Sequence, residues 1–383
     1  IGVNNVILEY STDQGSNWTY VVSTGNNSVP NTGSYYWASV PGAALSSYCK
    51  IRMHDINNAY ANDTGAGYFD LRGDLSVTRP AGGESWNLAT TENITWAKKG
   101  NIATVDVSYS ANNGTNWTTL ITGVTASNLT WPWGISNVTQ LTTQGKIKVA
   151  DSSNADVVYG VSDGTFGIKG RLQVSQPDAA GVVLTFGGAP YNITWIRFGT
   201  IANVNLSYST DGGLTWPNSI DTMVNATSGT PYSWGVPDAI GTNLSVKIID
   251  VDNPTVTDTS NNTFAIKGGM LVVSPNGNEN WLKGSQQQIQ WKPTGTYPGN
   301  VLLQYSANGV NWTDITLASA GANNVTQVYN WTVPDVIGDT LLVKVLTQMN
   351  QSSIDVNDTS NATFKIKGSV RVTSPNGGEI WYV

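Results

Sequence analysis

The sequence predicts an all-β chain, a tandem array of seven-stranded β-sandwiches, because two motifs recur with one spacing. The motif Ile-Lys-Gly, which is Leu-Arg-Gly in its first copy, recurs at 71–73, 168–170, 266–268 and 366–368. The motif Tyr-Ser recurs at Tyr10, Tyr109, Tyr208 and Tyr305. Both motifs repeat about every 98 residues, which is the length of one small sandwich. A chain of 383 residues therefore holds several such domains.

These recurrences divide the chain into repeats. We predict complete repeats at 74–170, 171–268 and 269–368, preceded by a partial repeat at 1–73 that holds strands C to G. Residues 369–383 supply strand A of a following repeat or a strand donated to another chain. No Pro- or Ser-rich linker separates one repeat from the next. We therefore expect a fairly stiff array in which each repeat contacts mainly its neighbours.

Alternating apolar residues and turn signals predict the strands of each repeat. Strand A is the triplet Leu-Ser-Val, Leu-Gln-Val, Leu-Val-Val or Val-Arg-Val at 75–77, 172–174, 271–273 and 370–372. Strand B ends on Trp96, Trp195 and Trp291. Strand C carries the Tyr-Ser motif, and a Tyr-x-Trp-x-Val-Pro strand, strand F and a final Phe-x-Ile-Lys-Gly strand follow it. About seven strands without an amphipathic helix predict an immunoglobulin-like or fibronectin-III-like sandwich.

Three of these motifs together resemble a known family. They are the opening Ser-Pro-Asn-Gly-Gly-Glu-x-Trp at 374–381, the Ile-x-Trp strand, and the turn Tyr-Ser-x-Asp-Gly-Gly-x-Thr-Trp at 208–216. They resemble the Ig-like domain of the Ser/Thr-rich GPI-anchored type, which occurs in fungal cell-wall assembly proteins and in tandem arrays on prokaryotic surface proteins. The resemblance covers essentially the whole chain and implies a fold rather than an activity. Repeat 171–268 departs from it at 177–188, where the Pro-Asn-Gly turn and its Trp are missing.

The turn at 208–216 also resembles the Asp-box of sialidases and related β-propellers. A propeller repeats its blade about every 40–50 residues, whereas this turn occurs once in each much longer repeat. Its aspartates, Asp13 and Asp211, become Asn112 and Asn308 in the other copies. We therefore interpret it as a hairpin turn in which Asp or Asn caps the backbone, Gly supplies positive φ, and Trp packs over the hairpin.

Residues suited to catalysis are scarce. The one histidine, His54, points outward on strand F and is interpreted as a surface residue. The one cysteine, Cys49, aligns with Leu244 and Leu341 on the inward face, so a buried small side chain is favoured over a reactive thiol, and an intrachain disulfide is impossible. We expect a protein without enzymatic activity.

Acidic residues cluster near the hairpins of strands F and G. One group is Asp250, Asp252 and Asp258, and a second is Asp151, Asp156 and Asp163. Calcium prefers several oxygen ligands on flexible loops, but the spacing matches neither an EF-hand nor a nonapeptide calcium loop, and Asp is common in turns. We expect no cofactor and no metal, with calcium at Asp250, Asp252 and Asp258 as the open alternative.

The fifteen tryptophans recur in register at the end of strand B, in the hairpin turn and in the Tyr-x-Trp strand. Recurrence at alternating positions favours packing in the core over a platform on which sugars stack. Trp131 and Trp133 fit this pattern least well, and we expect them to be the exposed pair.

The surface is poor in charge and rich in asparagine. Charged residues are 12% of the chain, and a net charge of −7 without a basic cluster argues against nucleic acid and anionic membranes as partners. No apolar run is long enough for a membrane span. Of 40 asparagines, 19 lie in N-x-[ST] sequons, more than chance gives, which predicts N-glycosylation outside the cell. These sequon asparagines are Asn17, Asn26, Asn62, Asn93, Asn113, Asn116, Asn128, Asn137, Asn192, Asn205, Asn225, Asn243, Asn261, Asn311, Asn324, Asn330, Asn350, Asn357 and Asn361.

Together these features predict a structural subunit or segment of an extracellular, glycosylated filament or cell-surface stalk. Its expected partners are other copies of itself or flanking repeats. Two alternatives remain: an adhesin or carbohydrate-binding array that binds cell-surface glycans, and a non-catalytic accessory region of a larger secreted enzyme. The chain ends also allow two interpretations. A window of a longer array is favoured over head-to-tail polymerisation, in which 369–383 completes the first repeat of the next subunit.

Overall fold

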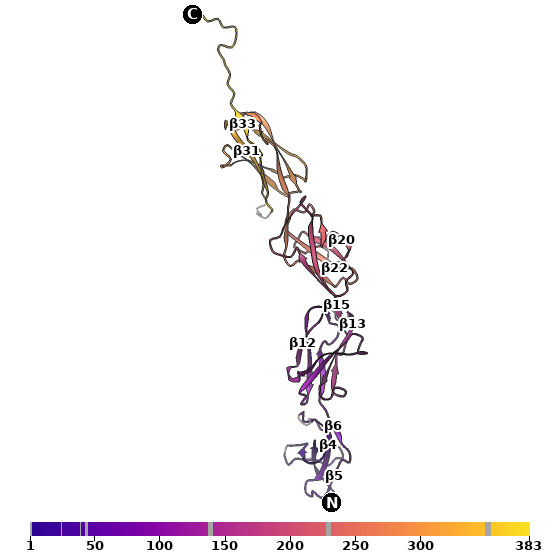
Figure 1. Ribbon diagram of the computed structural model, residues 1–383. Coiled ribbons are helices and arrows are strands. Elements are labelled where there is room, and N and C mark those ends of the chain that lie inside the picture. Colours follow the sequence, from indigo (N-terminus) through magenta and orange to yellow (C-terminus); the bar gives the residue numbers. More distant parts are fainter. Residues whose placement is uncertain are drawn as a thin grey trace. The chain divides into compact units, whose positions relative to one another are not determined.

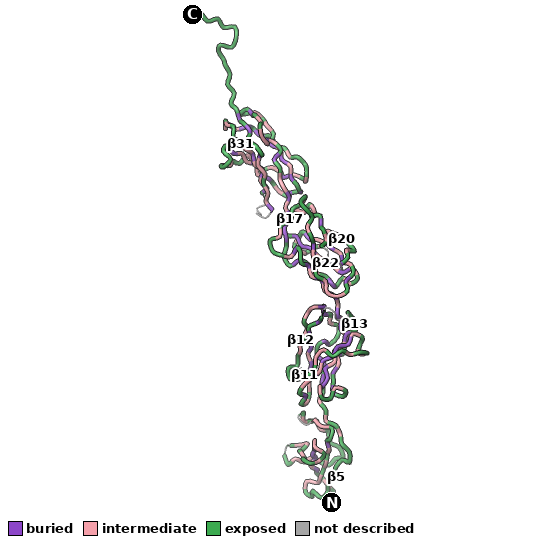
Figure 2. The backbone as a smooth tube through the Cα atoms, viewed as in Figure 1, coloured by how far each residue is buried: buried purple, intermediate pink, exposed green. Residues whose placement is uncertain are grey.

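The computed structural model describes residues 2–23, 25–38, 40–42, 45–136, 141–226, 231–348 and 354–383, and it confirms the all-β prediction. The chain is a tandem array of immunoglobulin-like or fibronectin-III-like sandwiches, with strands throughout (Figure 1). It divides into two compact units, Ile1–Arg171 and Leu172–Val383. Figure 2 shows buried residues (purple) alternating with exposed ones along the folded parts of the chain. No helix in the described residues is long and apolar enough to cross a membrane.

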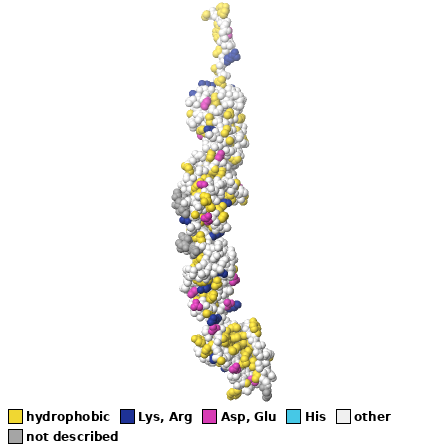
Figure 3. All heavy atoms as spheres, turned by 90° about the vertical axis from the view of Figure 1, so that its right-hand side faces the viewer, with side chains coloured by type: hydrophobic (Ala, Val, Ile, Leu, Met, Phe, Trp, Pro, Cys, Tyr) yellow, Lys and Arg dark blue, Asp and Glu magenta, His cyan; other side chains and the backbone are white. Residues whose placement is uncertain are grey.

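Residues 2–73 of the first unit form one sheet with the order β2-β1-β4-β5, in which β3 also pairs with β1 and β6 with β4. Its strands are β1 (Asn5–Ser11), β2 (Thr19–Tyr20), β3 (Ser28–Pro30), β4 (Ser46–Asp55), β5 (Asn62–Thr64) and β6 (Phe69–Leu71). The inward side chains Ile51 and Met53 of β4 are 37% and 45% exposed, whereas Ile147 and Val149 at the same places in the next repeat are fully buried. Hydrophobic side chains gather on this part of the molecule, lowest in Figure 3.

The rest of the first unit forms two sheets. A three-stranded sheet has the order β12-β9-β7, and a second sheet has the order β11-β10-β13-β15-β8, with β14 on β13. The elements are β7 (Asp74–Arg79), β8 (Ser85–Asn87), β9 (Thr91–Lys99), β10 (Thr104–Ser110), β11 (Thr118–Thr125), the 3-10 helix η1 (Ala126–Asn128), β12 (Thr130–Gly134), β13 (Thr142–Asp151), β14 (Tyr159–Val161) and β15 (Phe166–Lys169).

The second unit repeats this pair of sheets twice. The first pair has the orders β16-β18-β21 and β17-β24-β22-β19-β20, and the second has β25-β27-β30 and β26-β33-β31-β28-β29. The first set of strands is β16 (Arg171–Gln176), β17 (Val183–Thr185), β18 (Tyr191–Phe198), β19 (Asn203–Ser209), β20 (Asn218–Asn225), β21 (Tyr232–Trp234), β22 (Gly241–Asp250), β23 (Thr257–Thr259) and β24 (Phe264–Lys267). The second set is β25 (Gly269–Ser274), β26 (Asn280–Leu282), β27 (Gln286–Thr294), β28 (Asn300–Ser306), β29 (Thr313–Ser319), β30 (Gln327–Thr332), β31 (Gly338–Thr347), β32 (Asn357–Thr359) and β33 (Phe364–Lys367). Residues 369–383 follow as an exposed segment to which no strand is assigned, so the strand expected at 370–372 is not formed there.

Two short strands in each complete sandwich, and the 3-10 helix η1, are regular elements that the sequence pattern did not predict. One of the short strands, β14, β23 or β32, pairs with the long strand β13, β22 or β31. In each complete sandwich, β8, β17 or β26 pairs in parallel with the last strand, β15, β24 or β33. Trp281 of β26 lies opposite Ile366, and Leu184 of β17 lies opposite Ile266. The sequence of 177–188 departs from the other repeats but keeps this pairing, with a smaller side chain in place of Trp.

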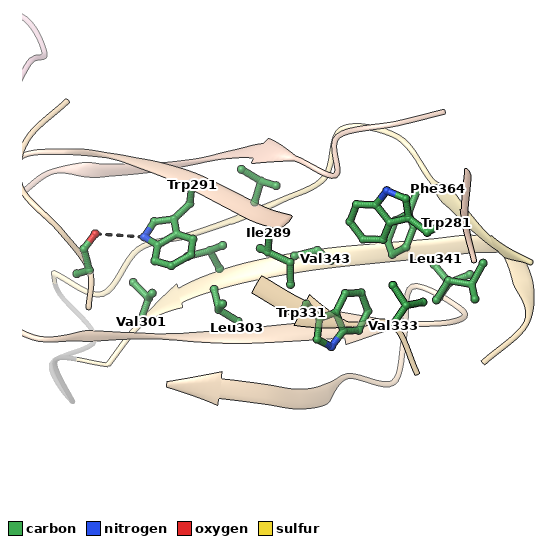
Figure 4. Close-up of a cluster of buried hydrophobic side chains, with 14 of the residues drawn as sticks. Trp281, Ile289, Trp291, Val301, Leu303, Trp331, Val333, Leu341, Val343 and Phe364 are labelled. Atoms are coloured by element: carbon green, nitrogen blue, oxygen red, sulfur yellow. Dashed lines mark hydrogen bonds between the residues drawn. The ribbon is translucent and has the colours of Figure 1, made fainter. Parts of the chain in front are cut away.

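The core lies between the two sheets, and Figure 4 shows that of residues 269–368. Trp281, Trp291 and Trp331 lie in it with Phe364, and all four are at least nine-tenths buried. The Nε1 of Trp291 donates a hydrogen bond to the carbonyl of Ala320 at 3.2 Å, drawn as a dashed line. A buried indole N–H without a partner would cost stability, so this bond fixes the orientation of the ring.

Candidate functional site

The Asp-box-like turn was the first candidate site, and its polar groups bond one another. Ser209 Oγ donates to Asp211 Oδ1 at 2.5 Å and accepts the N–H of Gly213 at 2.9 Å. Asp211 Oδ1 accepts the N–H of Thr215 at 2.9 Å, and Oδ2 accepts its hydroxyl at 2.5 Å. Gly213 has φ +90°, a conformation that favours glycine. The side chains of the motif thus satisfy the backbone of a tight hairpin, as interpreted from the sequence.

The tryptophan of this turn is held between glycine and a cation. A Cβ on Gly213 would lie 3.3 Å from Cζ2 of Trp216, and Lys247 Nζ lies 4.5 Å from the centroid of the ring. The other three turns also place Lys or Arg over Trp: Arg52 over Trp18, Lys148 over Trp117, and Lys344 over Trp312. The glycine contact recurs at Trp18 and Trp117. All four rings are half-buried. These contacts are cation–π interactions that stabilise the hairpin and cover part of each ring.

The electrostatics of the turn do not suit acid catalysis. Hydrogen bonds from the Ser209 hydroxyl, then from the Thr215 hydroxyl and N–H, lower the pKa of Asp211 to about 2. The N–H of Asn17, then its side-chain amide and the Ser11 hydroxyl, lower the pKa of Asp13 to about 2. A general acid needs a raised pKa to donate its proton near neutral pH. Both carboxylates remain ionised acceptors.

The tryptophans are mostly packed inside the sandwiches. Seven are at least nine-tenths buried: Trp86, Trp96, Trp133, Trp234, Trp281, Trp291 and Trp331. Trp133, which we expected to be exposed, is 5% exposed because it points inward from β12 and stacks on Tyr109 at 5.1 Å between ring centroids. Trp131, the other residue of that pair, is half-buried. Trp381 is the one exposed tryptophan among all fifteen, at 72%. The described surface therefore has no row of exposed Trp on which sugars could stack.

The acidic residues considered for calcium mainly bond the backbone. Asp258 Oδ2 accepts the N–H of Val174 at 2.7 Å, which attaches the first strand of its sandwich. Asp250 is buried, and its Oδ1 accepts the N–H of Asp252 at 3.0 Å. Within the described residues, no three His, Cys, Asp or Glu side chains gather in a way that could hold a metal ion.

The second acidic group lies in the sandwich before this one. Asp151 is buried and bonds the N–H of Ser153 at 3.0 Å, while Asp156 and Asp163 are exposed. Asp151 Oδ1 therefore also caps the backbone of its own hairpin.

His54 and Cys49 lie on the same strand, β4. His54 is half-buried, and its Nε2 lies 3.7 Å from Oε2 of the buried Glu9. Cys49 is fully buried, as its alignment with Leu244 and Leu341 predicts, and its Sγ lies 3.2 Å from the carbonyl of Ser46. A thiol without solvent access is poorly placed to react.

A cavity lies on the apolar face of β1 and β4. It measures about 410 Å³ and is lined by Val6, Leu8, Trp37, Ile51 and Met53, among others. In residues 269–368 the equivalent strands β28 and β31 are covered by the sheet that contains β27. The cavity therefore has the apolar lining of a core face rather than the convergent polar groups of a ligand site.

The sequon asparagines lie mostly on the surface. Asn137 and Asn350 are outside the described residues; every other one is exposed except Asn205, which is half-buried. Some of the exposed amides donate hydrogen bonds: Asn17 Nδ2 to Asp13 at 2.6 Å, Asn62 Nδ2 to the carbonyl of Ala59 at 2.7 Å, and Asn261 Nδ2 to Asp178 at 3.0 Å. Asn205 accepts the N–H of Met223 at 3.1 Å. Glycosylation of these residues stays a prediction.

Comparison with known proteins gives likenesses of structure only. No protein-family model matches the sequence, and no curated protein matches it. Among solved structures, titin domains I67–I69, as an E-to-A mutated variant, are 9% identical, with 78% of this chain and 100% of that chain covered and a TM-score of 0.30. The four N-terminal Ig domains of Dscam1 isoform 6.9 are 10% identical, with 94% and 91% covered and a TM-score of 0.29. The fibronectin(III)-like modules of Clostridium thermocellum CbhA are 18% identical, with 51% and 94% covered and a TM-score of 0.19.

Proposed function

We propose that the chain is a non-catalytic structural segment of an extracellular, N-glycosylated filament or cell-surface stalk. The observation that carries this proposal is the direct junction of successive sandwiches. In the second unit, β24 ends at Lys267 and β25 begins at Gly269, so a single residue, Gly268, separates the two. Sandwiches joined in this way have little freedom to move apart, which suits a stalk.

The chemistry of the side chains supports the same proposal. The carboxylates of Asp211 and Asp258 bond the backbone, and the tryptophans fill cores and hairpins. Few groups remain that could perform acid–base or nucleophilic chemistry. The sheet faces that sugars would have to occupy in an adhesin carry no row of exposed tryptophan among the described residues. A spacer function is therefore favoured over a carbohydrate-binding array or an accessory region of an enzyme.

Composition and exposure support glycosylation and a location outside the cell. A surface with few charged groups needs another means of solvation, and glycans at exposed sequons such as Asn116 and Asn311 provide one. The resemblance to Ig-like domains of the Ser/Thr-rich GPI-anchored type supports a cell-surface protein. The proposed partners are other copies of this chain or flanking repeats of the same fibre, with cell-surface glycans as the alternative.

Electron microscopy of the native material at the cell surface tests the proposal. We expect continuous filaments of domains joined head to tail, with density for sugar extending from sequons such as Asn116. Discrete particles with bare asparagines would contradict both the filament and the glycosylation. Filaments with bare asparagines would overturn glycosylation alone.

A further inference from the structure

The two sandwiches of the second unit meet at a joint that has an apolar part. Ile240 of the first sandwich packs against the core of the second. Its Cδ1 lies only 2.9 Å from where a Cβ on Gly295 would stand, so glycine permits the approach. Tyr297 is 4% exposed, and its hydroxyl accepts the N–H of Gly268 at 2.9 Å. A Cβ on Gly268 would lie 1.9 Å from the carbonyl oxygen of Thr294, which explains the Gly that ends the repeat.

The same joint has a polar part made by one carboxylate. Asp238 Oδ1 accepts the N–H of Thr296 at 2.7 Å, and Oδ2 accepts its hydroxyl at 2.8 Å. Thr296 is held in turn by Asn323, whose N–H donates to Thr296 Oγ1 at 3.3 Å and whose Oδ1 accepts the N–H of Gly295 at 2.9 Å. A carboxylate of one sandwich thus makes two charge-assisted bonds to a loop that its neighbour holds in place. We call the pair Asp238 and Thr296 the clamp.

The joint of the first unit, between residues 2–73 and 74–170, has the same apolar contacts. Leu45 Cδ2 lies 3.1 Å from where a Cβ on Gly100 would stand, and Ile102 Cδ1 lies 2.8 Å from where one on Gly73 would stand. By strand register these residues correspond to Ile240, Gly295, Tyr297 and Gly268, although the segment between Val-Pro and this strand is one residue longer in the first joint. The position of Asp238 in Val-Pro-Asp is filled by Gly42 in Val-Pro-Gly.

Glycine at that position removes the polar part of the joint. A Cβ on Gly42 would lie 3.3 Å from the Cα of Gly100, so the two backbones already touch. Gly42 has no side chain to bond Asn101, which occupies the position of Thr296. Among the described residues, the first joint therefore keeps the close approaches at glycine but has neither a carboxylate at the position of Asp238 nor the hydroxyl of Tyr297, which Ile102 replaces.

We infer that the clamp locks the angle of the joint in the second unit, and that the joint of the first unit pivots more freely. Apolar contact between domains opposes separation but only weakly opposes rotation, and relative motion is the default for small interfaces. Two bonds from a planar carboxylate to an N–H and a hydroxyl of one residue fix direction as well as distance. The inference goes beyond the proposed function, because it requires neither glycosylation nor a particular location.

Distance distributions between spin labels in the full 383-residue chain test this inference. For the second joint, cysteines at the exposed positions Ser219 and Leu317 carry the labels; for the first joint, Thr19 and Thr119 carry them. The native Cys49 is fully buried and stays unlabelled. We expect a narrower distribution across the second joint than across the first.

Substitution of the two clamp residues, Asp238 and Thr296, provides the decisive comparison. Asp238→Gly removes the clamp and should widen the distribution across the second joint by roughly twofold, since a small interface alone permits domain motion. Thr296→Val removes the hydroxyl bond and keeps the N–H bond, so it should widen the distribution less than Asp238→Gly does.

Asp335 supplies the matched control. It occupies the same Val-Pro-Asp position in the last sandwich, where it pairs with Lys283 of its own repeat. Asp335→Gly should leave both distributions unchanged. If Asp238→Gly and Thr296→Val leave the width across the second joint at its original value while circular dichroism shows intact sheets, the clamp does not lock the joint. An equal widening by Asp335→Gly would also overturn the inference. Neither result would bear on whether the protein forms a glycosylated filament.

Discussion

The two sandwiches of the second unit have the same strand order but fill the space between their sheets differently. Residues 269–368 have one continuous core that includes Trp281 and Trp291. In residues 171–268 the buried residues form two clusters, which the half-buried Trp195, Ile220 and Tyr232 join. Leu184 occupies the place of Trp281, and Trp195 that of Trp291. The topology therefore depends on strand pattern and backbone pairing, and the large rings add stability to it.

The two sandwiches should differ most in the unfolding free energy that they lose when the tryptophan at the end of strand B is replaced. Trp291→Ala removes a ring that is 1% exposed and leaves the Ala320 carbonyl without its donor, so it should cost about 3–5 kcal/mol of unfolding free energy. Trp195→Ala removes a half-buried ring and should cost clearly less. Native-state hydrogen exchange with mass spectrometry reads peptides of each sandwich separately within the whole chain. Equal losses would show that the division of the core has no energetic consequence.

The hydrogen bond that attaches the first strand should contribute equally to the stability of the two sandwiches. Asp258 Oδ2 accepts the N–H of Val174, and Asp358 Oδ2 accepts the N–H of Val272, both at 2.7 Å. Substitution of either Asp by Ala leaves that N–H unpaired and should cost about 1.5–3 kcal/mol, the range for bonds to charged groups. Hydrogen exchange of β16 and β25 measures it, with Asp→Asn as the control that keeps an acceptor. A loss confined to one sandwich would contradict the equivalence.

A smaller loss of stability is expected when Trp281 is replaced by leucine, the residue that the neighbouring sandwich has at this position as Leu184. Trp281→Leu gives the last sandwich the residue of its neighbour and removes ring contacts with Phe364 at 4.9 Å and Trp331 at 6.0 Å between centroids. Two aromatic pairs correspond to about 1–3 kcal/mol, while the parallel pairing of β26 with β33 should persist. Chemical denaturation measures the loss, and exchange protection of β33 reports the pairing. Loss of that protection would show that the indole is required for the topology.

The features that could be predicted from the sequence are the long strands and their buried faces, because they follow from alternating and recurring residues. Inward positions such as Val343 and Val345 repeat at every second residue, so the long strands and their buried faces followed directly. The three-residue strand β26 has no periodicity of its own, because its pairing with β33 is set by residues about 85 positions away. Its tryptophan was therefore assigned to a turn.

Polar contacts were the least predictable part of the candidate site. Val-Pro-Asp occurs at 236–238 and at 333–335, yet Asp238 bonds the next sandwich and Asp335 bonds Lys283 of its own. The difference lies in what each carboxylate faces, and sequence spacing does not encode that. The hairpin turn was predictable because Ser209, Asp211 and Thr215 bond within seven residues of chain. Hydrogen bonds within a short stretch of chain can be predicted from that stretch. The clamp joins residues of two sandwiches, so it can be seen only when both are folded.

The smallest predicted difference is the response of the two hairpin turns to acid. Asp211 of residues 171–268 has a pKa lowered to about 2 from an ordinary 3.8, and Asn308 takes its place in 269–368. A carboxyl group whose pKa is depressed by folding stabilises the fold above its ordinary pKa, and this stability is lost as pH falls through the folded pKa. The turn at 208–216 should therefore loosen between about pH 4 and pH 2 while the turn at 305–312 does not.

Nuclear magnetic resonance of the two amides bonded by these side chains measures the difference. The N–H of Thr215 donates to Asp211 and the N–H of Asn311 donates to Asn308, both at 2.9 Å. The shift of the Thr215 amide should titrate with a midpoint near 2, and that of Asn311 should stay constant. Asp211→Asn should abolish the titration and make the first turn behave as the second. A midpoint near 4 at Thr215 would mean that the hydrogen bonds to the carboxylate do not favour its ionised form. In that case the turn with Asp and the turn with Asn would respond to acid in the same way. The hydrogen bonds of the turn would stabilise the hairpin without a contribution from the negative charge.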